Sequence, residues 1–243
     1  GFFGEVLGKE SGLCRGHGGS MHVADFSKGM LGANGIVAAG IPIAMGSALA
    51  HKTLGRESIA IAFFGDGALA EGVLHESLNM SKLLCLPILF VCENNGWSEF
   101  SRSDHQITFN SRDFVSSYGI SYEKVDGNDV LAVKRAAGYV IDSVRKNSSP
   151  YFLECATTRF RGHFEGDAQK YRNDQERVAG EARDPLVFAE SRLLEMDCAP
   201  SRIAEVKEEV EESIESAIQL SLNDPESDFR SALESVYSSG RTR

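Results

Sequence analysis

Two short polar segments of this 243-residue chain carry the residue types that bind a divalent cation and phosphate. Gly65-Asp66-Gly67 follows the apolar run at residues 58–64, and Asn94-Asn95 follows the apolar run at residues 86–92. Asp66 offers a carboxylate, Asn95 an amide oxygen and the segment Gly96-Trp97-Ser98 a backbone carbonyl, and such oxygen ligands suit Mg²⁺. The two glycines allow a sharp turn and a close approach to a phosphate. These residues predict a magnesium-phosphate site.

Gly-Asp-Gly alone is weak evidence, because the same tripeptide also forms ordinary turns. The pairing with Asn94-Asn95 is more specific, since both segments follow predicted strands. Ligands of open α/β sheets bind outside the carboxyl ends of the strands, which is where both segments would lie. We therefore expect Asp66 and Asn95 to be neighbours in the folded chain.

The elements that would position these residues form a repeating pattern of strand and helix. Residues 58–64 read as a parallel strand buried on both faces, and residues 86–92 as a second buried strand. Between them we expect a helix from about Ala68, with apolar residues at helical spacing up to Leu83. The N–H groups of its first turn would point at the phosphate. A helix over residues 129–146 and a strand over residues 151–156 repeat the pattern, which predicts a doubly wound α/β fold with a mostly parallel sheet and helices on both faces.

The remaining segments complete this prediction. The glycine-rich stretch from Gly29 leads into small apolar residues through Ala50, which suits a tightly packed helix. Residues 159–181 are polar and aperiodic and read as a surface loop of functional importance. The chain becomes helical from Pro185, and residues 203–222 predict an amphipathic helix whose acidic face is most simply a solvated one.

Composition excludes several classes of function. The net charge of −10 and the scattered Lys and Arg residues argue against a nucleic-acid partner. The sequence holds no apolar stretch near the roughly 18 residues that a membrane helix needs. The five cysteines form no Cys-x-x-Cys pair, which favours a reducing, cytoplasmic setting. The chain begins with Gly1 and not with Met, so we expect it to be a fragment that lacks an N-terminal segment.

The spacing of the two polar segments resembles the motif of thiamine diphosphate enzymes, which begins Gly-Asp-Gly and ends Asn-Asn after roughly thirty residues. Asp66 and Asn95 stand 29 positions apart. Over nearly its whole length the chain is similar to the α subunit of the 2-oxo acid dehydrogenase E1 components, with further matches at residues 18–22 and 32–37. The resemblance implies a thiamine diphosphate-binding domain over residues 1–182, with its N-terminal part missing, and a C-terminal helical extension over residues 183–243 that packs on it.

The resemblance also assigns roles to individual residues. Mg²⁺ would be bound by the side chains of Asp66 and Asn95 and by the backbone carbonyl of Trp97. Further cofactor contacts match the following positions: Gly35 and Val37 at the aminopyrimidine ring, Gly67 and Ala68 at the diphosphate, and Arg159 near the diphosphate. The segment Ala68-Leu69-Ala70-Glu71-Gly72 departs from the family, which often has Ala-Ala-Asn-Gln-Gly there.

A second resemblance lies in the segment that runs from Arg161 through Gly162-His163-Phe164 to Asp167. A lone surface histidine is usually only solvated, but this one stands in the family's active-site loop, where His163 would be catalytic and would also contact the cofactor. A histidine that titrates near neutral pH can donate protons or steer an anionic intermediate. The loop and the following Tyr171-Arg172 look closer to acetoin dehydrogenase α subunits than to pyruvate dehydrogenases. Because Phe164 replaces the family's serine, we expect no phosphorylation switch here.

These matches imply an oxidoreductase that cleaves a C–C bond in acetoin or a 2-oxo acid with thiamine diphosphate and Mg²⁺. The product unit would pass to a lipoyl-bearing E2, and an α2β2 heterotetramer would form with an E1 β subunit. No carboxylate in this chain is placed to activate the cofactor, so the β subunit would supply it and the chain alone would be inactive. Two alternatives stay open: another thiamine diphosphate enzyme, such as a split transketolase, and a catalytically silent structural subunit.

Overall fold

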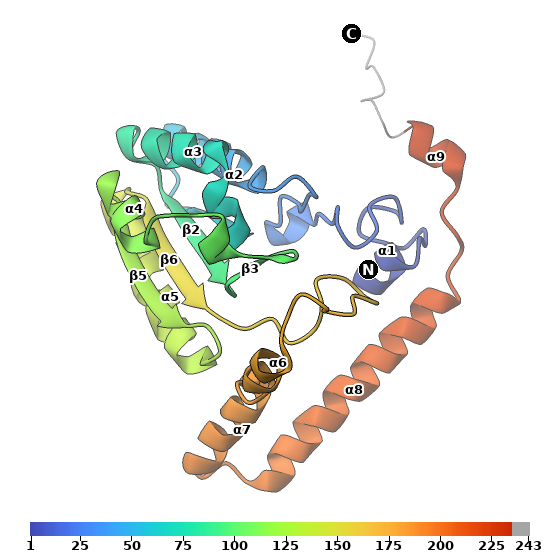
Figure 1. The fold of residues 1–243 in the computed structure, drawn as a ribbon. Helices are drawn as coiled ribbons and strands as arrows, with labels where there is room; N and C mark the ends of the chain where they lie inside the picture. The colour runs from blue at the N-terminus through green and yellow to red at the C-terminus, as the bar shows by residue number, and fades with distance from the viewer. Residues whose placement is uncertain (235–243) are drawn as a thin grey trace. The chain divides into compact units, whose positions relative to one another are not determined.

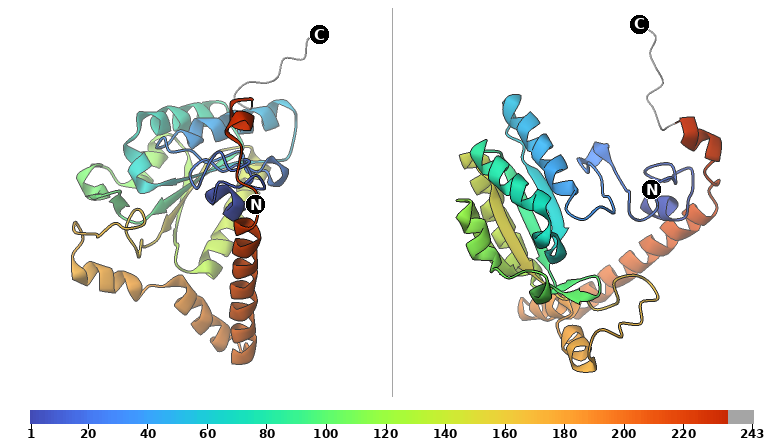
Figure 2. Two further views of the ribbon diagram at one scale, coloured as in Figure 1. Left: turned by 90° about the vertical axis from the view of Figure 1, so that its right-hand side faces the viewer. Right: turned by 45° about the horizontal axis from the view of Figure 1, so that its top comes forward.

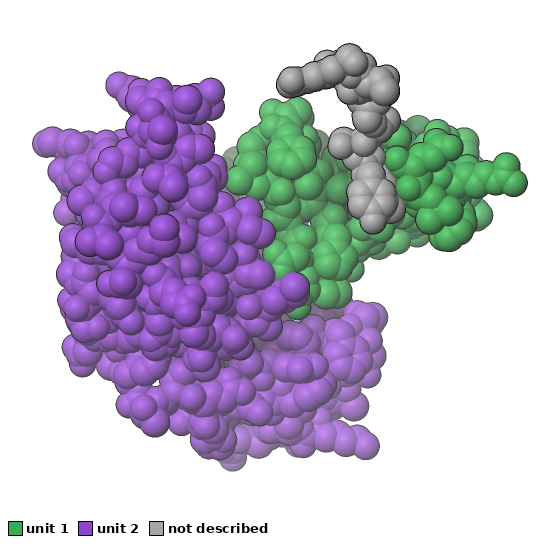
Figure 3. Space-filling view, turned by 90° about the horizontal axis from the view of Figure 1, so that it is seen from above, with its two compact units in different colours: residues 1–35, 197–243 green, residues 36–196 purple. Residues whose placement is uncertain are grey.

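The computed structural model describes residues 1–234, which fall into two compact units (Figure 3). Unit 1 contains residues 1–35 and the chain from Asp197 onward, and unit 2 contains residues 36–196. The predicted division into residues 1–182 and 183–243 therefore differs from the grouping by contacts, and it stays a prediction. Its last residues, 235–243, lie outside the described part of the chain.

Unit 2 is built on a parallel sheet with the strand order β1-β2-β6-β5 (Figure 1). The strands are β1 (Ala60–Gly65), β2 (Ile88–Asn94), β5 (Ser121–Asp126) and β6 (Tyr151–Ala156). Each neighbouring pair of strands is parallel: Phe63 of β1 lies beside Val91 of β2, and Val91 beside Leu153 of β6, which also pairs with β5. The predicted parallel α/β sheet is confirmed.

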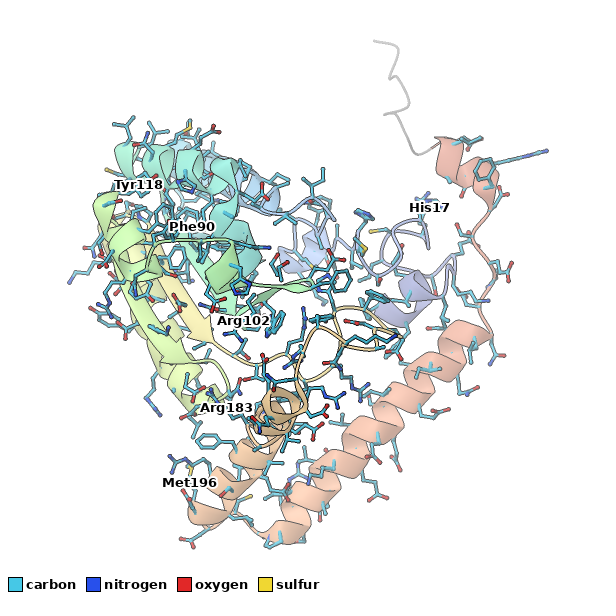
Figure 4. All side chains as sticks on the ribbon, viewed as in Figure 1. His17, Phe90, Arg102, Tyr118, Arg183 and Met196 are labelled. Carbon is cyan, nitrogen blue, oxygen red and sulfur yellow. The ribbon has the colours of Figure 1, made fainter. Side chains whose placement is uncertain are left out.

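Helices cover both faces of this sheet, as predicted, and Figure 2 gives two further views of them. On one face lie α2 (Gly40–Thr53), α3 (Gly72–Leu83) and α4 (Ser111–Ser117), and on the other lies α5 (Val130–Asn147). Phe90, labelled in Figure 4, is fully buried in the first of these cores, where its ring packs on that of Phe152. In the second core Val140 and Val144 of α5 pack against strands β2 and β6.

The first strand departs from its prediction, because only one of its faces is buried. Ala60, Ala62 and Phe64 point into the core, whereas Ile61 is half-exposed and Phe63 is 67% exposed. The apolar run at residues 58–64 predicted burial on both faces, and within the described residues this is wrong for β1. Strand β2, which has a neighbour on each side, is buried on both faces over Ile88–Cys92, as predicted.

The edge strand β5 was not predicted from the sequence. Only Tyr122 and Val125 of its six residues are apolar, and it holds Tyr122 and Lys124 beside β6. A short antiparallel hairpin of β3 (Trp97–Ser98) and β4 (Ser101–Arg102) follows β2, and the 3-10 helix η3 (Ser103–His105) follows the hairpin. The hairpin and η3 return the chain toward the end of β1.

The segment predicted as a surface loop at residues 159–181 is a loop only up to Asn173. It ends in helix α6 (Asp174–Glu181), where the side chain of Asn173 accepts a hydrogen bond from the Glu176 amide at 2.8 Å. Helix α7 (Pro185–Glu195) follows and begins with proline at its first turn, where a missing N–H costs nothing.

Unit 1 contains α1 (Phe2–Val6), the 3-10 helix η1 (Phe26–Lys28), α8 (Pro200–Leu222) and α9 (Phe229–Glu234). The predicted amphipathic helix is confirmed as α8. Glu5 is fully buried and accepts hydrogen bonds from the amides of Cys14, Gly16 and Gly18 at 2.6–2.9 Å. This buried carboxylate holds together a turn that has little apolar core of its own. No helix in the described residues is long and apolar enough to cross a membrane.

Candidate functional site

Asp66 lies at the carboxyl end of β1, as the first residue of the 3-10 helix η2 (Asp66–Ala70). Strand β2 runs beside β1, with Glu93 opposite Gly65, so the residues that follow the two strands emerge next to each other. The Oδ1 atom of Asp66 accepts a hydrogen bond from the Asn95 amide at 3.3 Å. The predicted proximity of Asp66 and Asn95 is thus present in the fold.

The carboxylate of Asp66 is 1% exposed. Burial raises its pKa, and hydrogen bonds from the Ser103 hydroxyl and from nearby backbone amides offset part of this effect. No Lys or Arg side chain forms an ion pair with Asp66 anywhere in residues 1–234. A buried carboxylate without a cation is costly, and a bound metal ion would remove that cost.

The other predicted metal ligands lie in one tight turn at residues 94–97. The side-chain oxygen of Asn94 accepts from the Gly96 amide at 3.0 Å, and that of Asn95 accepts from the Trp97 amide at 2.9 Å. Gly96 has a φ of 77°, which is the left-handed region that favours glycine. The turn places the backbone amide of Asn95 beside Asp66, and β3, which begins at Trp97, contacts η2.

Gly67 is required by a close contact with the hairpin. A Cβ atom built at this position would lie 2.6 Å from Oγ and 2.8 Å from Cβ of Ser98. Any larger residue would push Ser98, and with it the turn that carries Asn95 and Trp97. The second glycine of Gly-Asp-Gly therefore keeps the two halves of the candidate site together.

The helix predicted to begin near Ala68 begins later. Residues Asp66–Ala70 form the 3-10 helix η2, and α3 starts at Gly72, where Glu71 in extended conformation precedes its first turn. Ala68 itself is 2% exposed and packs in the core. The physical reason is that Ala68 and Leu69 insert into the core next to β1, which a continuous helix would not allow.

Arg159 and His163 lie close together in the loop that follows β6. The guanidinium of Arg159 donates to the Glu99 carbonyl at 2.8 Å and to the Tyr171 hydroxyl at 2.9 Å, and it lies 3.2 Å from Nδ1 of His163. Because a guanidinium can only donate, Nδ1 must accept, and the neutral ring carries its proton on Nε2. The Nε atom of Arg159 is buried and has no hydrogen-bond partner within the described residues, so a donor remains for an anionic ligand.

Asp167 and Tyr171 shape the same loop. The Oδ2 atom of Asp167 accepts from the His163 amide at 2.8 Å and from the Tyr171 hydroxyl at 2.6 Å. The hydrogen bond from Tyr171 lowers the pKa of Asp167, and the interactions with the His163 amide and with Arg159 act in the same direction. The pair fixes the loop on both sides of His163.

The Trp97 side chain connects the turn at residues 94–97 with this loop. Its ring lies 5.3 Å from that of Tyr171, and its Nε1 atom donates to Glu176 of α6 at 2.6 Å. The guanidinium groups of Arg102 and Arg172 lie over the indole at 5.6 and 5.9 Å, and Figure 4 labels Arg102. Trp97 is therefore a packing centre as well as a candidate ligand through its carbonyl.

The predicted site residues are thus brought together only in part. Asp66, Gly67, Ala68, Asn95 and Trp97 form one cluster, and Arg159 and His163 join it through Glu99 and Tyr171. Val37, which is half-exposed, belongs to unit 2, and Gly35 belongs to unit 1. Their contact with an aminopyrimidine ring stays a prediction.

Sequence reasoning missed the residues that support this cluster from outside the motif. Ser98 packs on Gly67, the Ser103 hydroxyl donates to Asp66, and Glu154 of β6 accepts from Asn94. Each is an ordinary residue type at a position that only the folded chain brings near the site. The one sequence signal was the position of Glu154, a single acid in an apolar strand.

Comparison with known proteins identifies related sequences. The family model described as dehydrogenase E1 component matches residues 1–230. The α subunit of an acetoin:2,6-dichlorophenolindophenol oxidoreductase from Bacillus subtilis is 42% identical over 98% of this chain and 72% of its own length. The subunit of the same name from Cupriavidus necator is 49% identical over 74% of this chain and 53% of its own length. The pyruvate dehydrogenase E1 component subunit alpha of Rhizobium meliloti is 35% identical over 94% of this chain and 66% of its own length.

Proposed function

Since this chain belongs to the dehydrogenase E1 component family as an α subunit, we propose that its Asp66–Asn95 cluster holds the Mg²⁺ and diphosphate of thiamine diphosphate. We further propose that the reaction is the oxidative cleavage of acetoin. The single observation that carries the cofactor proposal is the buried Asp66 carboxylate, which has no cationic partner among residues 1–234 and lies against the Asn95 turn.

The residues of the cluster fit a metal-bound diphosphate. Asp66 and Asn95 would bind Mg²⁺ with their side-chain oxygens, and Trp97 with its backbone carbonyl, a set of hard oxygen ligands. Gly67 would leave the backbone open to the diphosphate, and the buried Nε of Arg159 would donate to an anion. When bound, thiamine diphosphate supplies a nucleophilic carbon that attacks a carbonyl and stabilises the negative charge left by C–C cleavage.

The role of this chain in the chemistry is to orient groups and to donate a hydrogen bond where negative charge develops. His163 carries its proton on Nε2 while Arg159 holds Nδ1, so the Nε2–H group can donate a hydrogen bond to an oxygen of the substrate on which negative charge develops. Asp167 and Tyr171 hold the loop so that the ring keeps this orientation. We propose that a β subunit supplies the carboxylate that activates the cofactor, in an α2β2 assembly that passes its product unit to a lipoyl-bearing E2.

The substrate proposal rests on the comparisons. Two relatives whose names specify acetoin are 42% and 49% identical to this chain, and the pyruvate dehydrogenase subunit of Rhizobium meliloti is 35% identical. The aromatic residues Phe100 and Phe164, whose rings lie 6.3 Å apart, flank His163. They give the loop an apolar wall, which suits an uncharged substrate such as acetoin better than a 2-oxo acid.

The test uses the chain assembled with its β partner. We expect Mg²⁺-dependent uptake of thiamine diphosphate by calorimetry, and we expect Asp66→Ala to abolish it. Asp142→Ala is the matched control, because this exposed aspartate lies on α5, on the opposite side of the sheet from Asp66. Uptake by the Asp66→Ala assembly equal to that of the parent would refute the site.

Turnover then tests the reaction and the need for a partner. Reduction of 2,6-dichlorophenolindophenol should be faster with acetoin than with pyruvate or a branched 2-oxo acid, and it should require the β subunit. Faster turnover of a 2-oxo acid would overturn the substrate assignment but not the site. Turnover by this chain alone would overturn the shared site.

A further inference from the structure

Glu154 is a buried acid in the centre of the sheet that the proposed chemistry does not use. It lies in β6 between β2 and β5, opposite Cys92 on one side and Lys124 on the other, and it is 1% exposed. Its Oε1 atom accepts from Asn94 Nδ2 at 3.0 Å and from Lys124 Nζ at 2.7 Å, and its Oε2 atom accepts from the Tyr122 hydroxyl at 2.7 Å. Three donors from two neighbouring strands thus converge on one carboxylate.

The electrostatics of this group favour a permanent acceptor. Burial alone would raise the pKa of Glu154, but the hydrogen bonds from Lys124, Tyr122 and Asn94 and the charge of Lys124 outweigh burial and lower it. Burial and the hydrogen bond to Glu154 raise the pKa of Tyr122, so its hydroxyl stays protonated and donates. The carboxylate therefore accepts from all three neighbours.

This fixes the orientation of Asn94. A carboxylate only accepts, so the Asn94 amide must turn its NH2 group to Glu154 and its oxygen to the Gly96 amide, 3.0 Å away. The Asn94 carbonyl is held as well, by the Thr157 amide at 2.8 Å. Asn94 is thus attached to β6 by its side chain and its backbone, and its side-chain oxygen defines the turn that contains Asn95.

We propose that Glu154 is a positioning residue for the metal site, which acts through Asn94 and Gly96 to place the ligand Asn95 beside Asp66. This inference rests on the proposed function, since it assumes that Asn95 binds Mg²⁺. It explains why an acid is kept in an otherwise apolar strand: only a carboxylate can accept from Asn94, Lys124 and Tyr122 together. It also explains the first residue of the Asn94-Asn95 pair, which connects the sheet to the ligand.

The first test replaces the carboxylate with an amide of the same shape. Glu154→Gln has one accepting oxygen and an NH2 group, which must face one of the three donors. Loss of a supporting partner of a metal ligand costs about 10–100-fold in metal affinity. In the α/β assembly, the Mg²⁺ concentration that half-saturates thiamine diphosphate uptake should rise by about this factor.

The matched control is Glu123→Gln, because Glu123 lies on β5 next to Lys124 and points to the other face of the sheet. We expect its Mg²⁺ requirement to equal that of the parent. A purely structural role is separated by a double-mutant cycle with Asn94→Ala. If Glu154 acts through Asn94, Glu154→Gln should change the Mg²⁺ requirement of the Asn94→Ala protein by less than about twofold, because the link is already cut.

If Glu154→Gln does not assemble, Tyr122→Phe removes one donor without a change of shape and should raise the Mg²⁺ requirement to a smaller extent. An unchanged requirement in the variants that assemble, or an equal further rise in the Asn94→Ala background, would overturn the inference. These outcomes leave the proposed function intact. A parent assembly that takes up no thiamine diphosphate with Mg²⁺ would instead refute the proposed function itself.

Discussion

The contact between Gly67 and Ser98 predicts a specific failure and a specific rescue. In Gly67→Ala the new Cβ atom would lie 2.8 Å from the Ser98 Cβ and 2.6 Å from its Oγ. Both distances are much shorter than an ordinary contact of 3.4–4 Å. Gly67 is held between the end of β1 and the buried Ala68, so the backbone has little room to retreat. Overpacking of this kind costs about 1–3 kcal/mol in free energy of unfolding.

The rescue removes the obstructing atoms. Ser98→Gly removes the two nearest atoms and leaves the Cα of residue 98 at 3.5 Å from the new Cβ, which is ordinary contact. This change alone should destabilise the hairpin by about 0.5–1 kcal/mol, because glycine gains freedom in the unfolded chain. The double variant Gly67→Ala, Ser98→Gly should therefore be more stable than the sum of the single changes, by an amount close to the cost of Gly67→Ala.

The assay is equilibrium unfolding in urea, followed by the fluorescence of Trp97, which is the only tryptophan of the chain and lies next to Ser98. Circular dichroism of the same samples reports the helices independently. An unfolding free energy of Gly67→Ala equal to that of the parent would refute the steric argument. Additive effects of the two changes would show that Ser98 is not the obstacle.

Two further predictions concern pH and catalysis. The pKa of Glu5 is lowered, because hydrogen bonds from Gly18, Gly16 and Cys14 outweigh the effect of burial, so its stabilisation is present above its ordinary value of 4.5 and is lost as pH falls through the folded-state value. Glu5→Gln should cost about 1–3 kcal/mol near neutral pH, and urea unfolding of parent and variant should converge as the pH is lowered; a constant difference would contradict this. For His163→Gln we expect turnover lower by about 10²–10³-fold, measured by dye reduction in the α/β assembly saturated with thiamine diphosphate. Turnover near that of the parent would refute a role of His163 as a hydrogen-bond donor in the reaction.

The parts of the fold that the sequence predicted well are those whose burial determines their composition. Strand β6 was predicted at its observed bounds, because a fully buried strand must be apolar and Tyr151–Ala156 contains one acid only. The proximity of Asp66 and Asn95 followed from the topology, since consecutive parallel strands end at the same edge of a sheet. For these residues, the local sequence pattern is sufficient to predict their position in the fold.

The missed parts are those whose neighbours lie far away in sequence. Strand β5 is an edge strand rich in charged residues, in which Lys124 pairs with Glu154 of β6 and Asp126 with Arg183, so its pattern resembles a loop. The start of α3 was predicted too early, because small and apolar residues such as Ala68 and Leu69 suit both a helical turn and a short segment buried in the core. The exposed face of β1 could not be predicted, because an apolar run shows only that burial of its side chains would be favourable. It does not show whether another element covers each face of the strand. In the described residues nothing covers Phe63.

Two acids, Glu154 in β6 and Asp66 directly after β1, are equally buried but differ in their surroundings, which supports a positioning role for Glu154 and a ligand-binding role for Asp66. Glu154 and Asp66 are each 1% exposed. Glu154 has Lys124 at 2.7 Å, and its pKa is lowered; Asp66 receives only neutral donors in the described chain, and its pKa is raised. The charge of a buried carboxylate that has its own cation is neutralised, whereas a buried carboxylate with neutral donors alone keeps an uncompensated negative charge. The acid without a cation is the one beside Asn95, and this contrast supports the proposal that Asp66 binds the metal ion.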